Sequence, residues 1–177
     1  MSLPASVRAA VVVSALLGLA PGAPGQQPAQ DGWRPFTATW SLSGQRDVVL
    51  TEGERPASIV HLRGPLTLTS GEGLGRGFFG DVIGFDDGGT LLAGRAVFTD
   101  QRGDRIYCLL KAEPVGNGRR ATATITGGTG RFAGIEGSFS FAWQYVVDQE
   151  GGEMSLRTVN IEGRTRRGPA PRLQGGS

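Results

Sequence analysis

The chain has 177 residues, of which 38% are hydrophobic and 19% charged, a balance typical of a folded domain and not of a disordered chain or a membrane bundle. The formal net charge is only +2, and no basic stripe is interleaved with aromatic residues, which argues against nucleic-acid binding. The single cysteine, Cys108, cannot form an intramolecular disulfide, so the fold must be stable through its core alone. We expect Cys108 itself to be a buried core residue.

Residues 1–25 have the pattern of a signal peptide. Arg8 is followed by an apolar run from Ala9 to Ala20 and then by small residues. The run is shorter than the about 20 apolar residues that a membrane-spanning helix needs. We therefore expect an exported protein, periplasmic or extracellular, with residues 26–33 as a flexible linker. The alternative is a buried N-terminal helix.

Residues 34–166 are predicted to form one all-β domain, because runs of alternating apolar and polar residues are separated by glycine-rich turns. Gly44 to Arg46 is interpreted as a turn, and Gly64-Pro65 as a bend or break within a strand. The Arg-, Pro- and Gly-rich residues 167–177 are predicted to be a disordered tail. The expected strands are 35–43, 47–51, 57–70, 78–85, 90–99, 105–112, 119–126, 135–147 and 154–165.

The spacing of these strands predicts the architecture. About eight strands at intervals of about 10–15 residues, with no amphipathic helical stretch after the signal peptide, favour an antiparallel sandwich or a closed barrel. Because each strand is joined to the next by a short turn, an up-and-down β-barrel of the calycin type is the more economical solution, and it leaves no exposed sheet edge.

The stretch from Ile135 to Val147 has the clearest strand pattern. Alternate residues are aromatic or aliphatic, and the residues between them are mostly polar or small. Since successive side chains of a strand point to opposite faces, this predicts a continuous aromatic stripe on the inward face. The stripe consists of Ile135, Gly137, Phe139, Phe141, Trp143, Tyr145 and Val147.

A glycine-rich motif precedes that strand. Residues 128–133 fit the dinucleotide-binding pattern G-x-G-x-x-G/A. A dinucleotide loop must open a helix that holds the pyrophosphate at its N-terminus, whereas a strand pattern follows here. We therefore predict no cofactor, and interpret Gly127, Gly128 and Gly130 as a corner that reverses the chain, with Phe132 folded back into the core.

The segment ITGGTGRFAGIEGSFSF, from Ile125 to Phe141, resembles the glycine turn of the allene oxide cyclase and dirigent superfamily of β-barrels. The segments Gly94–Asp100 and Gly103–Tyr107 resemble small exported bacterial members. The resemblance implies an eight-stranded barrel with an apolar cavity, often assembled as a trimer. Plant members use the cavity to bind or cyclise an oxylipin, or to steer the coupling of phenolic radicals. No motif outside the corner matches, so the catalytic residues do not carry over.

The predicted function is non-catalytic binding of a small apolar or aromatic molecule inside the barrel. One alternative is a cyclase or isomerase in the same cavity, which would need an inward ionisable group; the residues to examine are Arg63, Asp81, Glu136 and His61. The other is a structural or assembly module with a solid core. The predicted cavity-lining residues are Trp40, His61, Arg63, Tyr107, Phe139, Phe141, Trp143 and Tyr145.

The remaining candidates for chemistry are weaker. One histidine without a second ligand does not make a metal site, so no metal is predicted. Asp86, Asp87, Asp100 and Asp104 stand where turns favour aspartate, and we interpret them as turn residues.

Overall fold

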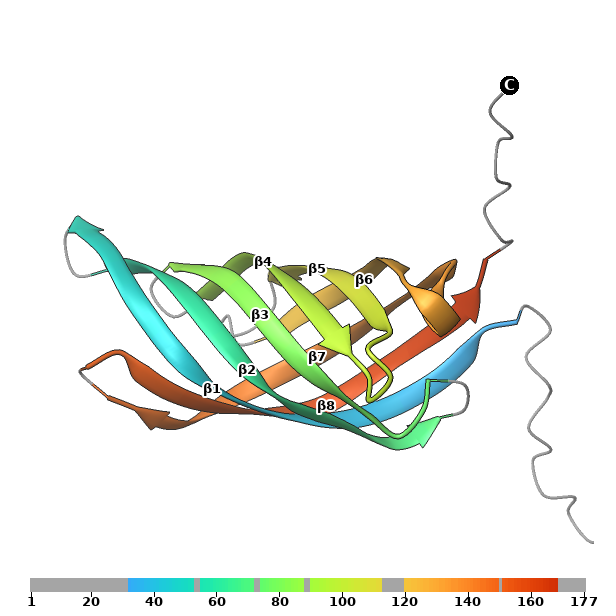
Figure 1. Ribbon diagram of the computed structural model, residues 1–177. Coiled ribbons are helices and arrows are strands. Elements are labelled where there is room, and N and C mark those ends of the chain that lie inside the picture. The colour runs from blue at the N-terminus through green and yellow to red at the C-terminus, as the bar shows by residue number, and fades with distance from the viewer. Residues whose placement is uncertain are drawn as a thin grey trace, which may run out of the picture.

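The computed structural model describes residues 32–52, 55–71, 74–87, 90–112, 120–149 and 151–168. These residues form one closed barrel of eight antiparallel strands, each paired with its neighbours along the chain, with β8 paired to β1 (Figure 1). The predicted fold class is therefore confirmed. The predicted signal peptide lies outside the described residues. The strands are β1 (Arg34–Glu52), β2 (Arg55–Gly71), β3 (Gly77–Asp87), β4 (Thr90–Thr99), β5 (Arg105–Ala112), β6 (Arg120–Gly128), β7 (Ile135–Asp148) and β8 (Glu153–Arg167).

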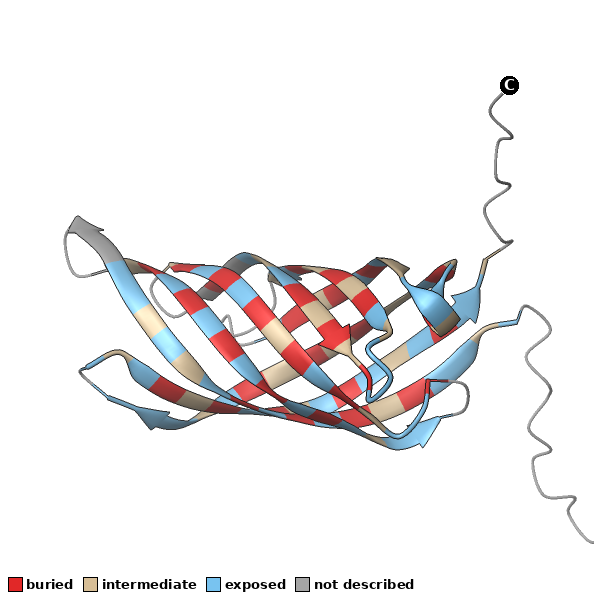
Figure 2. Ribbon diagram, viewed as in Figure 1, coloured by how far each residue is buried: buried red, intermediate tan, exposed pale blue. Residues whose placement is uncertain are grey.

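Burial alternates along the strands, as a sheet with one face on the core and one on solvent requires (Figure 2). On β3, Phe78 and Val82 are buried, whereas Phe79 and Ile83 are exposed. The inward side chains come from every strand and make one contiguous hydrophobic core. The period-two pattern in the sequence is thus the pattern of inside and outside in the barrel.

The two ends of the barrel differ. At one, which we call the corner end, β1 begins and β8 ends, beside the β4–β5 turn and the β6–β7 connection (Figure 1). At the other, which we call the cavity end, β3 and β7 end while β4 and β8 begin. Leu74 and Phe132 are buried at the corner end, so that end of the core is plugged by side chains.

The β6–β7 connection is the predicted glycine corner. After β6 the chain makes a single 3₁₀ turn, Gly130–Phe132, and enters β7 directly. Gly130 has φ 53°, a left-handed conformation that suits glycine. At Gly128 a Cβ atom would lie 2.6 Å from the Phe132 carbonyl oxygen, so the chain folds back on itself too closely for a side chain. Phe132 is buried with its ring 5.5 Å from that of Phe78, as predicted.

The predicted turn at Gly44 to Arg46 is wrong, and of the two interpretations of Gly64-Pro65 the break is excluded. β1 runs without a turn through Gly44, and β2 runs as one strand through Gly64-Pro65. A Cβ on Gly44 would overlap the His61 carbonyl oxygen, and one on Gly64 would overlap that of Ser41. Glycine is present there because β1 and β2 approach each other closely within a continuous hairpin, and not because the chain turns.

Candidate functional site

Aromatic side chains fill the middle of the barrel. The Trp40 ring lies 4.9 Å from that of Phe98 and 6.1 Å from that of Phe141. Phe139 lies about equally close to Phe98 and Phe36, at 6.0 and 5.9 Å. These edge-on and tilted contacts are the geometries that aromatic pairs favour. The aromatic layer divides the interior into two small spaces.

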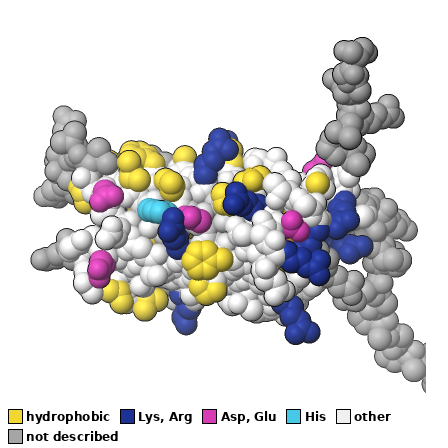
Figure 3. Space-filling view, viewed as in Figure 1, with side chains coloured by type: hydrophobic (Ala, Val, Ile, Leu, Met, Phe, Trp, Pro, Cys, Tyr) yellow, Lys and Arg dark blue, Asp and Glu magenta, His cyan; other side chains and the backbone are white. Residues whose placement is uncertain are grey.

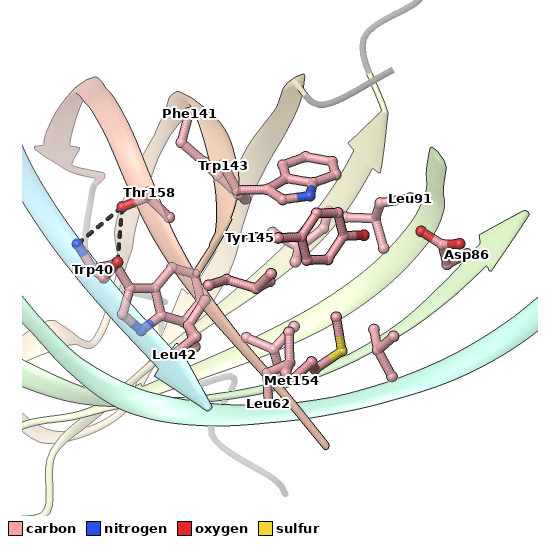
Figure 4. A pocket seen from close by; sticks show the side chains of 14 residues that line it. Trp40, Leu42, Leu62, Asp86, Leu91, Phe141, Trp143, Tyr145, Met154 and Thr158 are labelled. Atoms are coloured by element: carbon pink, nitrogen blue, oxygen red, sulfur yellow. Dashed lines mark hydrogen bonds between the residues drawn. The ribbon is translucent and has the colours of Figure 1, made fainter. Parts of the chain in front are cut away.

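The larger space is an apolar cavity of about 50 Å³ between the aromatic layer and the cavity end. Figure 4 shows its walls, which come from most of the strands of the barrel. It is lined by Trp40 and Leu42 (β1), Val60 and Leu62 (β2), Val82 and Asp86 (β3), Leu91 (β4), Leu110 (β5), Phe141, Trp143 and Tyr145 (β7), and Met154, Leu156 and Thr158 (β8).

The floor of this cavity is held in place by hydrogen bonds. The Trp40 indole N–H donates to the Gly64 carbonyl at 3.1 Å, and the Trp40 backbone N–H donates to the Thr158 hydroxyl oxygen at 2.9 Å. The Thr158 hydroxyl in turn donates to the Trp40 carbonyl at 3.2 Å (Figure 4). The polar atoms of the floor therefore bond to one another, and the surface offered to a ligand is apolar.

The mouth of the cavity carries its polar groups. Asp86 is buried, with 8% of the residue exposed, and the Tyr145 hydroxyl is directed to the side on which Asp86 lies (Figure 4). Burial, and then the negative charge of Asp86, raise the pKa of the Tyr145 phenol above its ordinary value. The Arg46 guanidinium lies 5.8 Å from the Tyr145 ring centre and is paired with Asp148. Because its pKa is raised, the Tyr145 phenol is a hydrogen-bond donor and not an anion at neutral pH.

The smaller space, of about 30 Å³, lies on the corner side of the aromatic layer. Phe36, Phe78, Phe98 and Phe139 supply its aromatic walls, and aliphatic side chains supply the rest. No ionisable side chain is among the residues that line it within the described part of the chain.

Five of the eight predicted lining residues face the interior. Trp40, Phe141, Trp143 and Tyr145 line the larger cavity, and Phe139 lines the smaller one. The alternation along residues 135–147 was sufficient to place four of them on one face. Whether they bind a ligand stays a prediction.

The other three predicted lining residues, His61, Arg63 and Tyr107, lie on the outer wall. His61 Nε2 is 2.8 Å from one Asp81 carboxylate oxygen, and Arg63 Nε is 3.1 Å from the other. Burial alone raises the pKa of Asp81, but the bonds from His61 and Arg63 outweigh it and hold that pKa below its ordinary value. The prediction failed because His61 and Arg63 alternate with the buried Leu62, and Tyr107 alternates with the buried Cys108.

The four ionisable residues named for an enzymatic cavity all lie outside it. Besides His61, Arg63 and Asp81, Glu136 is half-exposed and paired with Arg166 on the outer wall. Asp86 is the ionisable residue that sequence reasoning missed, because a turn was the simpler explanation for an aspartate before two glycines. Its parity gives a usable signal, since residues 82, 84 and 86 share a face and Val82 points inward.

Two other kinds of chemistry would need a reactive thiol or a metal site. Burial raises the pKa of the Cys108 thiol to about 12, so this inward residue is a protonated core group, as expected. Among the residues that the structure describes, no three histidine, cysteine or acidic side chains are grouped closely enough to hold a metal ion. No helix in the described ranges is long and apolar enough to cross a membrane.

Comparisons with known proteins find a match among solved structures alone. No protein-family model matches the sequence, and no curated protein matches it either. Among solved structures, that of a pterocarpan synthase dirigent protein is similar to this barrel, with a TM-score of 0.44 and 16% sequence identity. The match covers 86% of this chain and 100% of the dirigent protein chain.

Proposed function

We propose that the barrel binds a small apolar or aromatic molecule in the cavity above Trp40, without chemical conversion. The observation that carries the proposal is a cavity whose walls are almost wholly apolar and whose floor has its polar atoms bonded to each other. An apolar space of this kind favours an apolar occupant over water. Asp86 and Tyr145 at the mouth would orient a hydroxyl or amine of the ligand toward solvent.

The volume sets the size of the ligand. About 50 Å³ exceeds the roughly 10–15 Å³ that a single water needs on the same kind of measure. It is far below the about 300–1,000 Å³ of pockets for drug-sized ligands. This space is about a third of the roughly 150 Å³ of an engineered cavity that binds benzene, so a ligand with one ring enters only if side chains at the mouth move apart.

The resemblance of the glycine corner to allene oxide cyclase and dirigent proteins supports a binding role for the interior. We also propose that the protein is exported after residues 1–25 are removed. A cyclase or isomerase in the same cavity is the alternative. Asp86 would be its base, because the raised pKa of Tyr145 keeps that phenol protonated and able only to donate a proton.

Met154 provides a direct test of binding. It lines the cavity, and of the two methionines in the chain it is the one that follows the predicted signal peptide. With an isotope-labelled methionine methyl group, titration with toluene is expected to shift the Met154 resonance saturably, because the ligand ring would lie against it. No shift at toluene saturation would overturn the proposal.

Two neighbouring positions on β3 give a matched pair of variants. Val82→Phe places a ring in the cavity, whereas Ile83→Phe places the same ring on the outer wall, where Ile83 is 56% exposed. We expect Val82→Phe to abolish the toluene response and Ile83→Phe to preserve it. A response that survives in Val82→Phe would mean that toluene binds elsewhere.

A second candidate, the assembly module, has an observation of its own. Ile59, Phe79, Ile83 and Phe85 are all exposed on the outer wall of β2 and β3, and Ile59 lies opposite Phe85 in the strand pairing. Figure 3 shows apolar side chains on both sides of the single histidine, His61, of this wall. We propose that this outer apolar patch contacts a second copy of the chain, with a trimer as the form that the resemblance implies.

Sedimentation measures this association directly. The unsubstituted chain is expected to sediment as an oligomer, and Ile83→Glu as a monomer, because the carboxylate would be buried without a partner. A monomer at every concentration of the unsubstituted chain would remove this candidate and leave the cavity proposal untouched.

A further inference from the structure

A groove of about 460 Å³ lies at the corner end of the barrel, on the opposite side of the aromatic layer from the cavity. It is formed where β1 begins and β8 ends, beside the 3₁₀ turn. Arginine side chains from three separate segments border it. The lining residues are Gly32, Arg34, Leu74, Arg131, Phe132, Ile135, Thr165, Arg166 and Arg167.

Two of the arginines in the groove face carboxylates. Arg131 Nε lies 2.8 Å from Asp100, whose side chain is fully buried, so this guanidinium is fixed within the fold. Arg166 lies 2.9 Å from Glu136, and both side chains are nearly half-exposed. An exposed pair of this kind is weak and can exchange its carboxylate for another anion.

The other two arginines of the groove, Arg34 and Arg167, have no acidic partner among the described residues. Arg167 donates one hydrogen bond to the Arg131 carbonyl at 3.0 Å, which leaves most of its N–H donors unused. Arg34 is exposed and makes no ion pair or side-chain hydrogen bond within the described ranges. The groove therefore holds two positive charges that no described carboxylate neutralises. Figure 3 shows Lys and Arg side chains gathered at this end of the barrel.

The floor of the groove is apolar. Leu74, Phe132 and Ile135 are buried beneath the guanidinium groups, and the Arg131 guanidinium carbon lies 4.6 Å from the centre of the Phe132 ring. On the outside, the guanidinium groups of residues 164 and 166 lie 4.9 and 4.6 Å from the Trp33 ring, which restricts where they point. The groove thus combines oriented cations with an apolar surface.

We propose that this groove binds the phosphate monoester of a small apolar or aromatic molecule. Guanidinium groups match the oxygens of a phosphate with paired hydrogen bonds. A phosphate monoester carries about −1.5 to −2 charges at neutral pH, which fits two uncompensated arginines better than the single charge of a carboxylate. The organic part of the ester would lie beside the guanidinium groups, against the apolar part of the groove lining. This site is separate from the apolar cavity and does not depend on the function proposed for it.

Calorimetric titration of the full chain with phenyl phosphate at low salt tests the site. Arg34→Gln and Arg167→Gln are each expected to weaken binding about tenfold, the usual effect of losing one hydrogen bond to a charged group. The control is Arg95→Gln, which makes the same change in charge at an exposed position on the outer wall of β4. It is expected to bind within about twofold of the unsubstituted chain, because Arg95 does not border the groove and makes no hydrogen bond to the ligand there.

Two further titrations establish the class of ligand. Inorganic phosphate is expected to bind more weakly than phenyl phosphate because it leaves the apolar floor uncovered. Benzoate is expected to bind more weakly because it carries one charge. The proposal is overturned if the full chain does not bind phenyl phosphate, if Arg95→Gln loses as much affinity as Arg34→Gln, or if benzoate binds as tightly. Unfolding curves of the variants check that each is folded.

Discussion

At the residue scale, Asp100 ties two distant turns together. One carboxylate oxygen accepts hydrogen bonds from the backbone N–H groups of Arg102 and Asp104, at 2.8 and 2.9 Å, and the other faces the Arg131 guanidinium. The first two bonds are the turn chemistry that the sequence predicts for aspartate. The third contact joins the β4–β5 turn to the glycine corner, and the sequence around Asp100 does not predict it.

The contribution of this network to folding stability depends on pH. Burial alone raises the pKa of Asp100, but its backbone donors and Arg131 outweigh burial and hold the pKa below its ordinary value. The stabilisation is therefore complete above the unfolded-state pKa of about 3.9 and is lost as the pH falls through the lower folded-state value. Denaturant unfolding of Asp100→Asn should show a large loss at neutral pH that shrinks in acid.

Asp81→Asn is the comparison for this prediction. Asp81 is also paired with cations, but it is 40% exposed, so its replacement should cost less at every pH. If the loss caused by Asp100→Asn were independent of pH, or no larger than that of Asp81→Asn, the network would not have the role assigned to it.

Gly80 is the position on β3 that makes room for the cavity floor. A Cβ atom there would lie 2.6 to 2.9 Å from three atoms of the buried Trp40 indole. Gly80→Ala is therefore expected to displace the indole from its bond to Gly64 and to destabilise the fold by about 1–3 kcal/mol, as overpacking does. Gly151→Ala, where a Cβ meets nothing within 4 Å, should stay within about 0.5 kcal/mol of the unsubstituted chain.

For both variants the free energy of unfolding is measured by denaturant unfolding, and the tryptophan environment by near-ultraviolet circular dichroism. Unchanged stability and an unchanged tryptophan spectrum in Gly80→Ala would show that Trp40 is not held as described. The sequence predicts Trp40 as a cavity-lining residue. It could not identify Gly80 as its partner, because that contact joins β1 to a strand with which β1 does not pair.

At the element scale, β8 contains an irregularity that a side chain must accommodate. Asn160 has φ 53°, and the pairing of β8 with β7 shifts between Val159 and Glu162. Asparagine tolerates this left-handed conformation better than alanine does. Asn160→Ala should cost about 1 kcal/mol of stability, while Asn160→Gly should stay within about 0.5 kcal/mol, by denaturant unfolding. Equal stability of the Asn160→Ala variant and the unsubstituted chain would contradict a bulge that requires φ above zero.

The sequence predicts a strand well where the local alternation determines it, and poorly where contact with a neighbouring strand determines the conformation. Residues 135–147 lie in β7 because alternation over many residues has no other solution. Gly130 opens the turn between β6 and β7, where the strand patterns end, whereas Gly127 and Gly128 are the last two residues of β6. The sequence around Gly44 also predicts a turn, yet Gly44 lies within β1. Glycine is required at this position because β2 approaches β1 closely.

At the scale of the whole molecule, the order of the strands could be predicted and the filling of the interior could not. Short connections make an up-and-down barrel the simplest topology, and the pairing of β1 with β8 closes it. How much space remains inside depends on how rings such as Trp40, Phe98 and Phe139 interlock across the barrel. Sequence alternation says that they point inward but not how closely they pack.

The two ends of the barrel have opposite chemical character. The cavity end presents Asp86 beside an apolar space, with Arg46 of β1 paired to Asp148 of β7 nearby. The corner end presents a groove bordered by arginines over a plugged core. On the two proposals made above, the apolar ligand and the phosphate ester would occupy opposite ends of the barrel and would not compete.

A crystal of the full chain held under xenon pressure tests the apolar cavity most directly, since xenon enters dry apolar spaces. We predict a xenon site enclosed by Trp40, Leu110 and Phe141, with the surrounding side chains in place. Xenon bound only on the outer wall, or ordered water filling that space, would contradict a dry cavity suited to an apolar ligand.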